Sequence, residues 1–286
     1  MLQRVTALAW FRNRLWAASY GTGLFVLKGQ QWQPWMPEAI PRFLTCLSAD
    51  SQRLWFGTWM EGKIGYLDTD LHPHFISLPK LTTPRFVYRN SCLASEDSSV
   101  WLGTDGYLLN YDTQENDWQL ILAVGSVNSI QRMASLLWVG TDETLMVLEK
   151  KRNVPCSLRI VINQMRVSSL ATDGDTLWLG GQLKEEGCIG QYVVSERRFV
   201  PVRVPIKGWI NDITPMKNHL FFSVGSGSRS FDYGEEFPHG GVFIYNKRSR
   251  QWHRVKFISL TDVWCLLKVG QILYIGGYAG VQRIRV

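Results

Sequence analysis

An aliphatic residue followed by a large aromatic residue recurs seven times along this chain of 286 residues. Each aromatic lies eight positions after a Leu or Ile, whereas successive aromatics are separated by 37 to 53 residues. The seven pairs are Leu15-Trp16, Leu54-Trp55, Val100-Trp101, Leu137-Trp138, Leu177-Trp178, Leu220-Phe221 and Leu273-Tyr274. A fixed spacing inside each unit and a variable spacing between units indicate one module joined by loops of different length. Repeats of this size, built from short apolar runs and Gly-containing turns, are typical of β-propeller blades.

The third unit shows the expected blade most clearly. Its apolar runs predict four strands over 91–97, 100–104, 107–111 and 117–122, with a tight Asp105-Gly106 turn. Four antiparallel strands in series make one blade. We therefore predict an all-β, seven-bladed β-propeller that forms a single domain over residues 1–286. The predicted blades are about 4–36, 43–78, 86–122, 127–162, 164–203, 208–258 and 261–286.

Two positions of the repeat have the character of core positions. The aromatic on the second strand is expected to fill the gap between neighbouring blades, because burying such a ring removes about 150–250 Å² from water. The residue directly before the Leu or Ile is short, which suits the crowded innermost strand. In chain order this position holds Ala7, Cys46, Cys92, Ser129, Ser169, Asp212 and Cys265. Asp212 is expected to accept hydrogen bonds from inner-strand backbone donors.

The motif around the aromatic is similar to a known repeat. Leu54-Trp55-Phe56-Gly57-Thr58, Val100-Trp101-Leu102-Gly103-Thr104 and Leu137-Trp138-Val139-Gly140-Thr141 resemble the two-component regulator propeller repeat of bacterial sensor ectodomains. The resemblance extends over nearly the whole chain and implies a bacterial propeller. In that family the repeats lie outside the membrane and precede a signalling module. We see no export signal, membrane helix or downstream module, so the sensor role is not expected here.

The seventh unit differs from the others at its end. Its third strand runs to Val286, and Met1–Gln3 are the residues before the first strand of unit one. The last blade is therefore expected to be three-stranded or to be closed by the N-terminus. An exposed strand edge is a template for pairing, so a partner could add a strand there.

Charge, cysteine content and hydropathy bear on the partners and the cellular location of the protein. The net charge of +7 favours acidic partners, although a solubilising surface explains it as well. Three of the five cysteines share one repeat position and none forms a CxxC pair, which favours buried, reduced thiols. No segment has the length and apolarity of a signal peptide or a membrane span. We predict a cytoplasmic protein that does not enter the membrane.

A candidate binding site follows from propeller topology. Loops that enter the inner strands and loops between second and third strands share one face, over the mouth of the channel. Arg, which forms bidentate hydrogen bonds and stacks on rings, recurs there among aromatic residues and suits an acidic peptide segment or a phosphate-bearing ligand. The loop 225–240 adds three aromatics on the same face. The predicted partner-binding residues are Arg4, Arg42, Phe43, Tyr88, Arg89, Arg166, Trp209, Asp262, Phe231, Tyr233 and Phe237. A solvated rim of arginines stacked on aromatics is the alternative.

The residues predicted at the channel mouth also indicate whether the protein is an enzyme. We predict no catalytic residue, metal site or cofactor, because the mouth gathers arginines rather than clustered His or carboxylate ligands. His72, His74 and His219 fall on the opposite face, and the basic runs 149–152 and 247–250 there read as solvated turns rather than a nucleic-acid track. We therefore predict a non-catalytic platform that scaffolds or regulates a complex by binding a protein segment at the mouth. A small-ligand-binding or lyase/hydrolase-type propeller enzyme is the alternative.

Overall fold

Seven antiparallel sheets make up the part of the chain that the computed structural model describes. That part comprises residues 1–59, 61–80, 90–96, 98–149, 157–183, 186–203, 206, 208–225, 240–260 and 262–286. It divides into two compact units, Met1–Ile130 and Gln131–Val286, which we describe separately. Within these described residues, no helix is long and apolar enough to cross a membrane.

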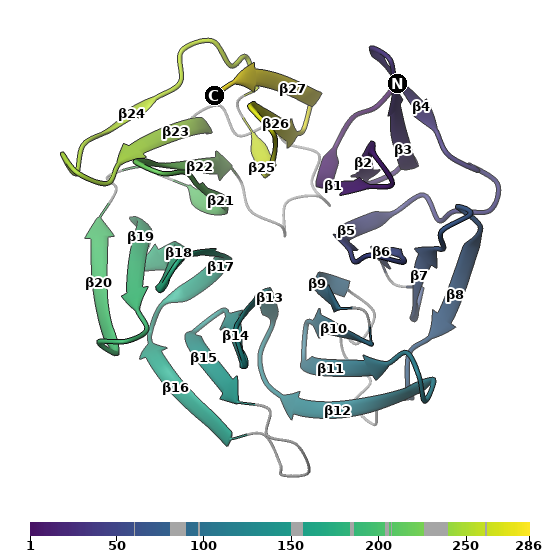
Figure 1. Cartoon of the computed structure of the whole chain (residues 1–286), viewed down its shortest axis with the longest axis horizontal. Coiled ribbons are helices and arrows are strands. Elements are labelled where there is room, and N and C mark those ends of the chain that lie inside the picture. The colour runs from purple at the N-terminus through teal and green to yellow at the C-terminus, as the bar shows by residue number, and fades with distance from the viewer. Residues whose placement is uncertain are drawn as a thin grey trace. The chain divides into compact units, whose positions relative to one another are not determined.

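The first unit contains three four-stranded blades (Figure 1). Blade 1 is β1 (Val5–Phe11), β2 (Arg14–Ser19), β3 (Gly23–Lys28) and β4 (Gln31–Pro34). Blade 2 is β5 (Leu44–Ala49), β6 (Leu54–Thr58), β7 (Lys63–Leu67) and β8 (Pro73–Ser77). Blade 3 is β9 (Asn90–Glu96), β10 (Ser99–Thr104), β11 (Tyr107–Asp112) and β12 (Asp117–Ala123).

The second unit contains most of blade 4 and the remaining blades; the boundary falls inside β13. Blade 4 is β13 (Val127–Met133), β14 (Leu136–Thr141), β15 (Thr144–Glu149) and β16 (Ser157–Asn163). Blade 5 is β17 (Arg166–Asp173), β18 (Thr176–Leu183), β19 (Glu186–Val193) and β20 (Arg198–Arg203). Blade 6 is β21 (Trp209–Pro215), β22 (His219–Gly225), β23 (Gly241–Asn246) and β24 (Trp252–Arg254). Blade 7 has three strands, β25 (Val263–Val269), β26 (Ile272–Gly277) and β27 (Gly280–Arg285).

This series confirms the predicted seven-bladed β-propeller, with strand order following chain order in every blade. The strands expected in blade 3 match β9–β12 to within one residue at each end. Of the two alternatives predicted for the last blade, a three-stranded sheet or closure by the N-terminus, the described residues form the three-stranded sheet. That the two units act as a single domain stays a prediction.

The second-strand aromatics lie in the core, as predicted. Trp16, Trp55 and Trp138 have no exposed surface, and the other four aromatics at this position are at most 8% exposed. Trp16 shares a hydrophobic cluster with Leu44 and Phe56 of the following blade. Trp178 does the same with Ile213 of blade 6. The ring therefore fills the space between consecutive blades of a unit.

The short residue on the inner strand explains the Gly of the motif. Cys46 pairs with Gly57, and Cys92 pairs with Gly103. A Cβ atom added at Gly103 would lie 2.5 Å from the Cys92 sulfur and 2.6 Å from a Val127 methyl group. Two small residues must therefore face each other where the next inner strand approaches.

A bulge near the start of the inner strand was not predicted. The register shifts by one residue there in six blades, for example between Val5 and Ala7. In three of these blades the bulged residue donates a side-chain hydrogen bond to a carbonyl of the following inner strand. These bonds are Thr6 Oγ1 to Leu44 O (3.0 Å), Ser168 Oγ to Ile210 O (2.5 Å) and Asn211 Nδ2 to Val263 O (2.9 Å). Such bonds fix where one inner strand starts relative to the next.

Candidate partner-binding surface

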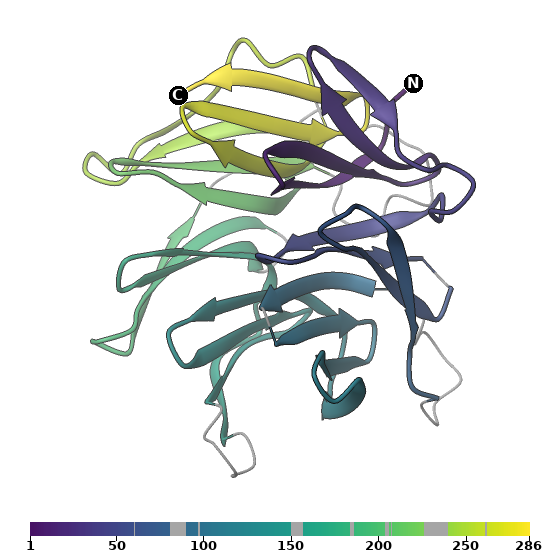
Figure 2. The ribbon, with the colours of Figure 1, turned by 45° about the vertical axis from the view of Figure 1, so that its right-hand side comes forward.

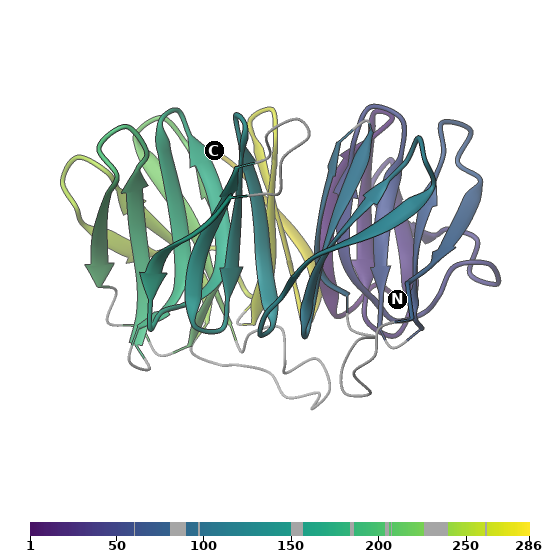
Figure 3. The same ribbon diagram turned by 90° about the horizontal axis from the view of Figure 1, so that it is seen from below.

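The residue that starts each inner strand lies next to the turn between the second and third strands. The Tyr20 amide donates to Arg4 O, and the Trp59 amide donates to Phe43 O, each at 2.9 Å. The Tyr278 amide donates to Asp262 O at 3.0 Å. Both kinds of loop therefore occupy one end of the blade, as the topology predicts; the other end carries the remaining turns (Figure 3). We call the first end the starting edge.

At the starting edge of blades 1 and 2, predicted residues lie beside an aromatic cluster. Tyr20 and Phe43 form an isolated β-bridge, and their rings meet edge to face with centroids 5.1 Å apart. The Trp59 ring also meets that of Tyr20 edge to face, with centroids 5.8 Å apart. Tyr20 is buried, whereas Phe43 remains 43% exposed and the neighbouring Arg42 is also exposed. This region therefore presents an aromatic ring and a guanidinium on a rigid support.

The starting edge of blades 5 and 6 is built differently. Arg166 donates from Nη2 to Oδ1 of Asp142 at 2.5 Å, and its guanidinium lies 3.9 Å from the centre of the Trp209 ring. The Arg166 side chain is only 18% exposed. Asp142 follows β14, so this arginine joins loops of three successive blades. Asp142 therefore compensates much of the charge of Arg166 inside the protein, and this mostly buried side chain differs from the solvated rim of the alternative.

Asp262 requires a correction to the predicted surface. This residue is 1% exposed, and its Oδ1 accepts a hydrogen bond from Trp264 Nε1 at 2.8 Å. A carboxylate enclosed in this way does not face a partner, so we leave it out of the surface. Five other predicted residues lie outside the described part of the chain: Tyr88, Arg89, Phe231, Tyr233 and Phe237.

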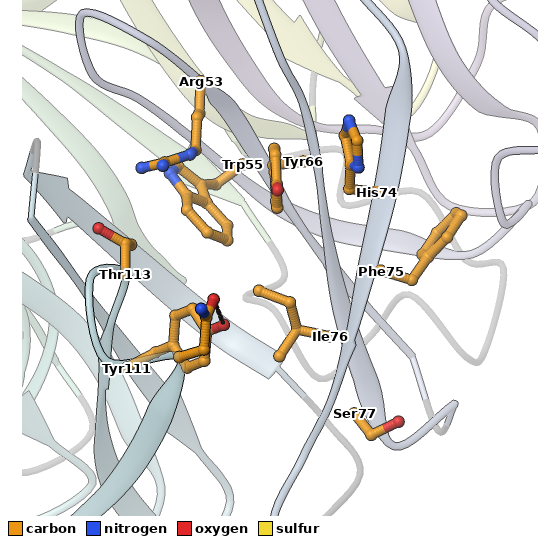
Figure 4. Close-up of a pocket in the computed structure, with 10 residues that line it drawn as sticks. Arg53, Trp55, Tyr66, His74, Phe75, Ile76, Ser77, Tyr111 and Thr113 are labelled. Carbon is orange, nitrogen blue, oxygen red and sulfur yellow. Dashed lines mark hydrogen bonds between the residues drawn. The ribbon is translucent and has the colours of Figure 1, made fainter.

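A pocket between blades 2 and 3, at the end away from the starting edge, was not predicted. It has a volume of about 440 Å³ (Figure 4). The Arg53 guanidinium lies 5.4 Å from the centre of the Tyr66 ring, which stacks on His74 at 4.8 Å. On the blade 3 side, Tyr111 donates its hydroxyl hydrogen to Asn116 at 3.0 Å. The pocket was hidden in the sequence because it combines turn, third-strand and outer-strand residues of two blades, and no fixed spacing relates them.

Next to this pocket, the β7–β8 turn gathers possible metal ligands. Ligand atoms of Asp68, Asp70 and His72 lie within 4.8 Å of one another. The hydrogen bond from His74, with others from the His72 and Asp70 amides, lowers the pKa of Asp68 to about 2. These bonds are those of a carboxylate that closes its own turn, so we assign no metal to the cluster.

Asp212 takes the backbone role expected for it. Its two carboxylate oxygens accept from the amides of Ile213 and Leu266, each at 2.7 Å. Burial raises the pKa of this carboxyl to about 7, despite both hydrogen bonds. The side chain thus ties the inner strand of blade 6 to that of blade 7.

Comparison with known proteins supports the fold. No family model and no curated protein matches the sequence, so membership of the resembled repeat family is not confirmed. Among solved structures, the extracellular domain of BT4673 from B. thetaiotaomicron, described as a hybrid two-component system, matches 99% of this chain with 16% identity and a TM-score of 0.74. The chain spans only 38% of that protein.

Two smaller propellers match over most of both chains. The WD40 propeller domain of Doa1 is 13% identical, with a TM-score of 0.71 over 98% of this chain and 92% of its own. YCF48, in a structure with a D1 peptide bound, is 12% identical, with a TM-score of 0.70 over 100% and 94%. Identities this low establish the propeller fold alone.

Proposed function

We propose that this protein is a non-catalytic, cytoplasmic interaction module that scaffolds or regulates a complex by binding a segment of a protein partner at its starting edge. The observation that carries the proposal is the exposed Phe43 ring, which follows Arg42 and packs against Tyr20, whose ring in turn meets that of Trp59. Aromatic and arginine side chains on rigid supports dominate the binding energy of protein interfaces. The exposed guanidinium and the net charge of +7 favour an acidic segment.

Two further observations support this choice. A peptide is bound to one propeller of the same fold, YCF48, which makes peptide capture a reasonable task for the scaffold. The four described cysteines are buried or half-buried, as small apolar thiols in a reducing compartment are. The pocket between blades 2 and 3 favours small-ligand binding as a second candidate function, because it joins aromatic walls to the charged Arg53.

A capture experiment with matched variants tests the proposal. The immobilised chain, its Arg42→Glu/Phe43→Ala variant and a Trp10→Ala control are each incubated with extract of the native host, and bound proteins are quantified by mass spectrometry. Trp10 is 43% exposed, like Phe43, but lies near the other end of β1. We expect the double variant to lose its partner at least about 30-fold, the equivalent of about 2 kcal/mol, while the control retains it. Equal capture by all three chains would contradict the proposal.

A further inference from the structure

In the part of the chain that the structure describes, blade 7 has three strands, whereas the other six blades each have a fourth, outer strand. Within the described residues, β27 is the outermost strand of its sheet and pairs with β26 alone. Figure 2 shows the three yellow strands of this blade side by side, with the C-terminus at the end of the outermost one. The six complete blades therefore serve as templates for what would fit beside β27.

The register identifies the equivalent positions in each third strand. Arg283 of β27 lies opposite the second-strand aromatic Tyr274. In each other blade, the equivalent of Ile284 is therefore the third-strand residue that directly follows the partner of the second-strand aromatic. In four of six blades the outer strand places a large aromatic opposite that residue. The pairs are Leu27 with Trp32, Tyr111 with Trp118, Tyr192 with Phe199 and Tyr245 with Trp252. An added strand would accordingly place an aromatic opposite Ile284.

The backbone of β27 has the orientation that pairing requires. Val281 lies opposite Gly276, two residues after the second-strand aromatic. The residues at the same register position are Leu24 in blade 1, opposite Ala18, and Val242 in blade 6, opposite Ser223. In those blades the carbonyls of Leu24 and Val242 accept bonds at 2.8 Å from Trp35 and Val255, beyond the third strand. Since alternate residues of a strand direct their N–H and C=O groups to the same side, Val281 and Arg285 direct theirs to the open edge.

Side chains near Ile284 define the chemistry of the missing strand. Ile284 is half-buried against the core that blades 6 and 7 share, whereas Arg285 is exposed. A hollow of about 470 Å³ opens here, lined by Val269, Ile272 and Ile284 among others. In blade 3 the residue before Trp118 is Asp117, which lies opposite Asp112, the counterpart of Arg285. An acidic residue at that place would face Arg285 directly, in a favourable cross-strand pair.

We propose that blade 7 binds an extended segment of a partner protein, antiparallel to β27, in which an acidic residue opposite Arg285 is followed by an aromatic residue opposite Ile284. The added strand supplies main-chain hydrogen bonds, and the two side chains supply selectivity. This inference rests on the proposed function in requiring a protein partner. It concerns a separate surface from the starting edge, so the two can fail independently.

The experiment uses a peptide of known sequence as the probe. A labelled peptide with the sequence of residues 115–123, Glu-Asn-Asp-Trp-Gln-Leu-Ile-Leu-Ala, carries the acidic–aromatic step of β12. Its binding to the full chain is followed by fluorescence anisotropy. We expect saturable binding below about 1 mM. Replacing the peptide Trp by Ala is expected to weaken binding at least about tenfold, because the anchoring ring is lost.

Variants of the chain locate the binding to β27. Arg285→Glu is expected to weaken the peptide about tenfold or more, and a peptide with Lys in place of its Asp is expected to restore binding to that variant. Val281→Pro removes an amide that faces the open edge and is expected to abolish binding, whereas Val281→Ala retains it. Thermal melting verifies that each variant is folded. The Phe43→Ala variant should bind the peptide normally, which separates this site from the starting edge.

Three results would overturn the proposal. The first is absence of peptide binding to the folded chain, and the second is binding that Val281→Pro leaves unchanged. The third is a dimer in sedimentation equilibrium that Val281→Pro converts to a monomer, because a second copy of the chain would then be the occupant of the edge.

Discussion

The inter-blade core and the starting edge both use one defined residue per blade, but the two regions treat it in opposite ways. The second-strand aromatic is at most 8% exposed in all seven blades. The residue that starts the inner strand is 43% exposed as Phe43, has an 18% exposed side chain as Arg166 and is 1% exposed as Asp262. The core position therefore has one structural role, whereas the starting position has several.

This difference follows from what surrounds each position. The aromatic is enclosed by its own sheet and, as for Trp16 and Trp178, by the next inner strand of the same unit, so packing selects one kind of side chain. The starting residue is fixed by its backbone hydrogen bond to the following hairpin, and its side chain meets loops that vary in length. Its side chain can therefore be displayed, paired or buried without changing the blade.

The largest contrast is expected between Trp16 and Phe43. Trp16→Ala should destabilise the protein by about 3–5 kcal/mol, because it leaves a cavity between blades 1 and 2. Phe43→Ala should cost less than about 1 kcal/mol, since nearly half of the ring is already in water. Urea denaturation of both variants measures the difference. Similar losses would mean that the starting edge belongs to the core.

The pH dependence of the free energy of unfolding tests the role of Asp212 in the inner strand of blade 6. Its pKa of about 7 in the folded protein exceeds the ordinary value of 3.8, so the folded state holds the proton more tightly. This contribution to stability is complete below pH 4 and is lost as the pH rises toward 7, by at most about 4 kcal/mol. The Asp212→Asn variant should lose one backbone hydrogen bond at every pH but lack this dependence. Denaturation at pH 5 and pH 8 compares the two proteins; parallel pH profiles would show that Asp212 does not titrate in this range.

The core position could be predicted from the sequence, whereas the side-chain contacts of the starting edge could not. The seven blades and their buried aromatics could be predicted, because a fixed spacing of eight residues encodes them directly. The pairing of Arg166 could not, since Asp142 lies 24 residues before Arg166 and no spacing relates their side chains. The pocket around Arg53 and Tyr111 was missed because it brings together side chains of two blades that no fixed spacing relates. Side-chain pairing between loops of different blades leaves no periodic signal.

The two glycines of blade 3 sharpen the comparison within one hairpin. Gly103→Ala should destabilise by about 1–3 kcal/mol, because the new methyl group would overlap Cys92 and Val127. Gly106→Ala should change stability by less than about 0.5 kcal/mol, since an added Cβ meets no atom within 4 Å. Thermal melting of the two variants side by side decides the point. Equal destabilisation would show that the close approach of Cys92 and Val127 does not determine the cost at Gly103.

The smallest expected effects separate two arginines of the starting edge. Arg166→Met should destabilise by about 1–2 kcal/mol, because it removes the contact with Trp209 and leaves the partly buried Asp142 without its cation. Arg42→Met should stay within about 0.5 kcal/mol, since Arg42 is exposed. Charge reversal at Arg166 should accordingly destabilise the protein more than charge reversal at Arg42. Chemical denaturation at low and high salt measures all four variants. If Arg166→Met is as neutral as Arg42→Met, the contacts of Arg166 with Asp142 and Trp209 contribute nothing to stability. Arg166 would then be as available as Arg42 for binding a partner.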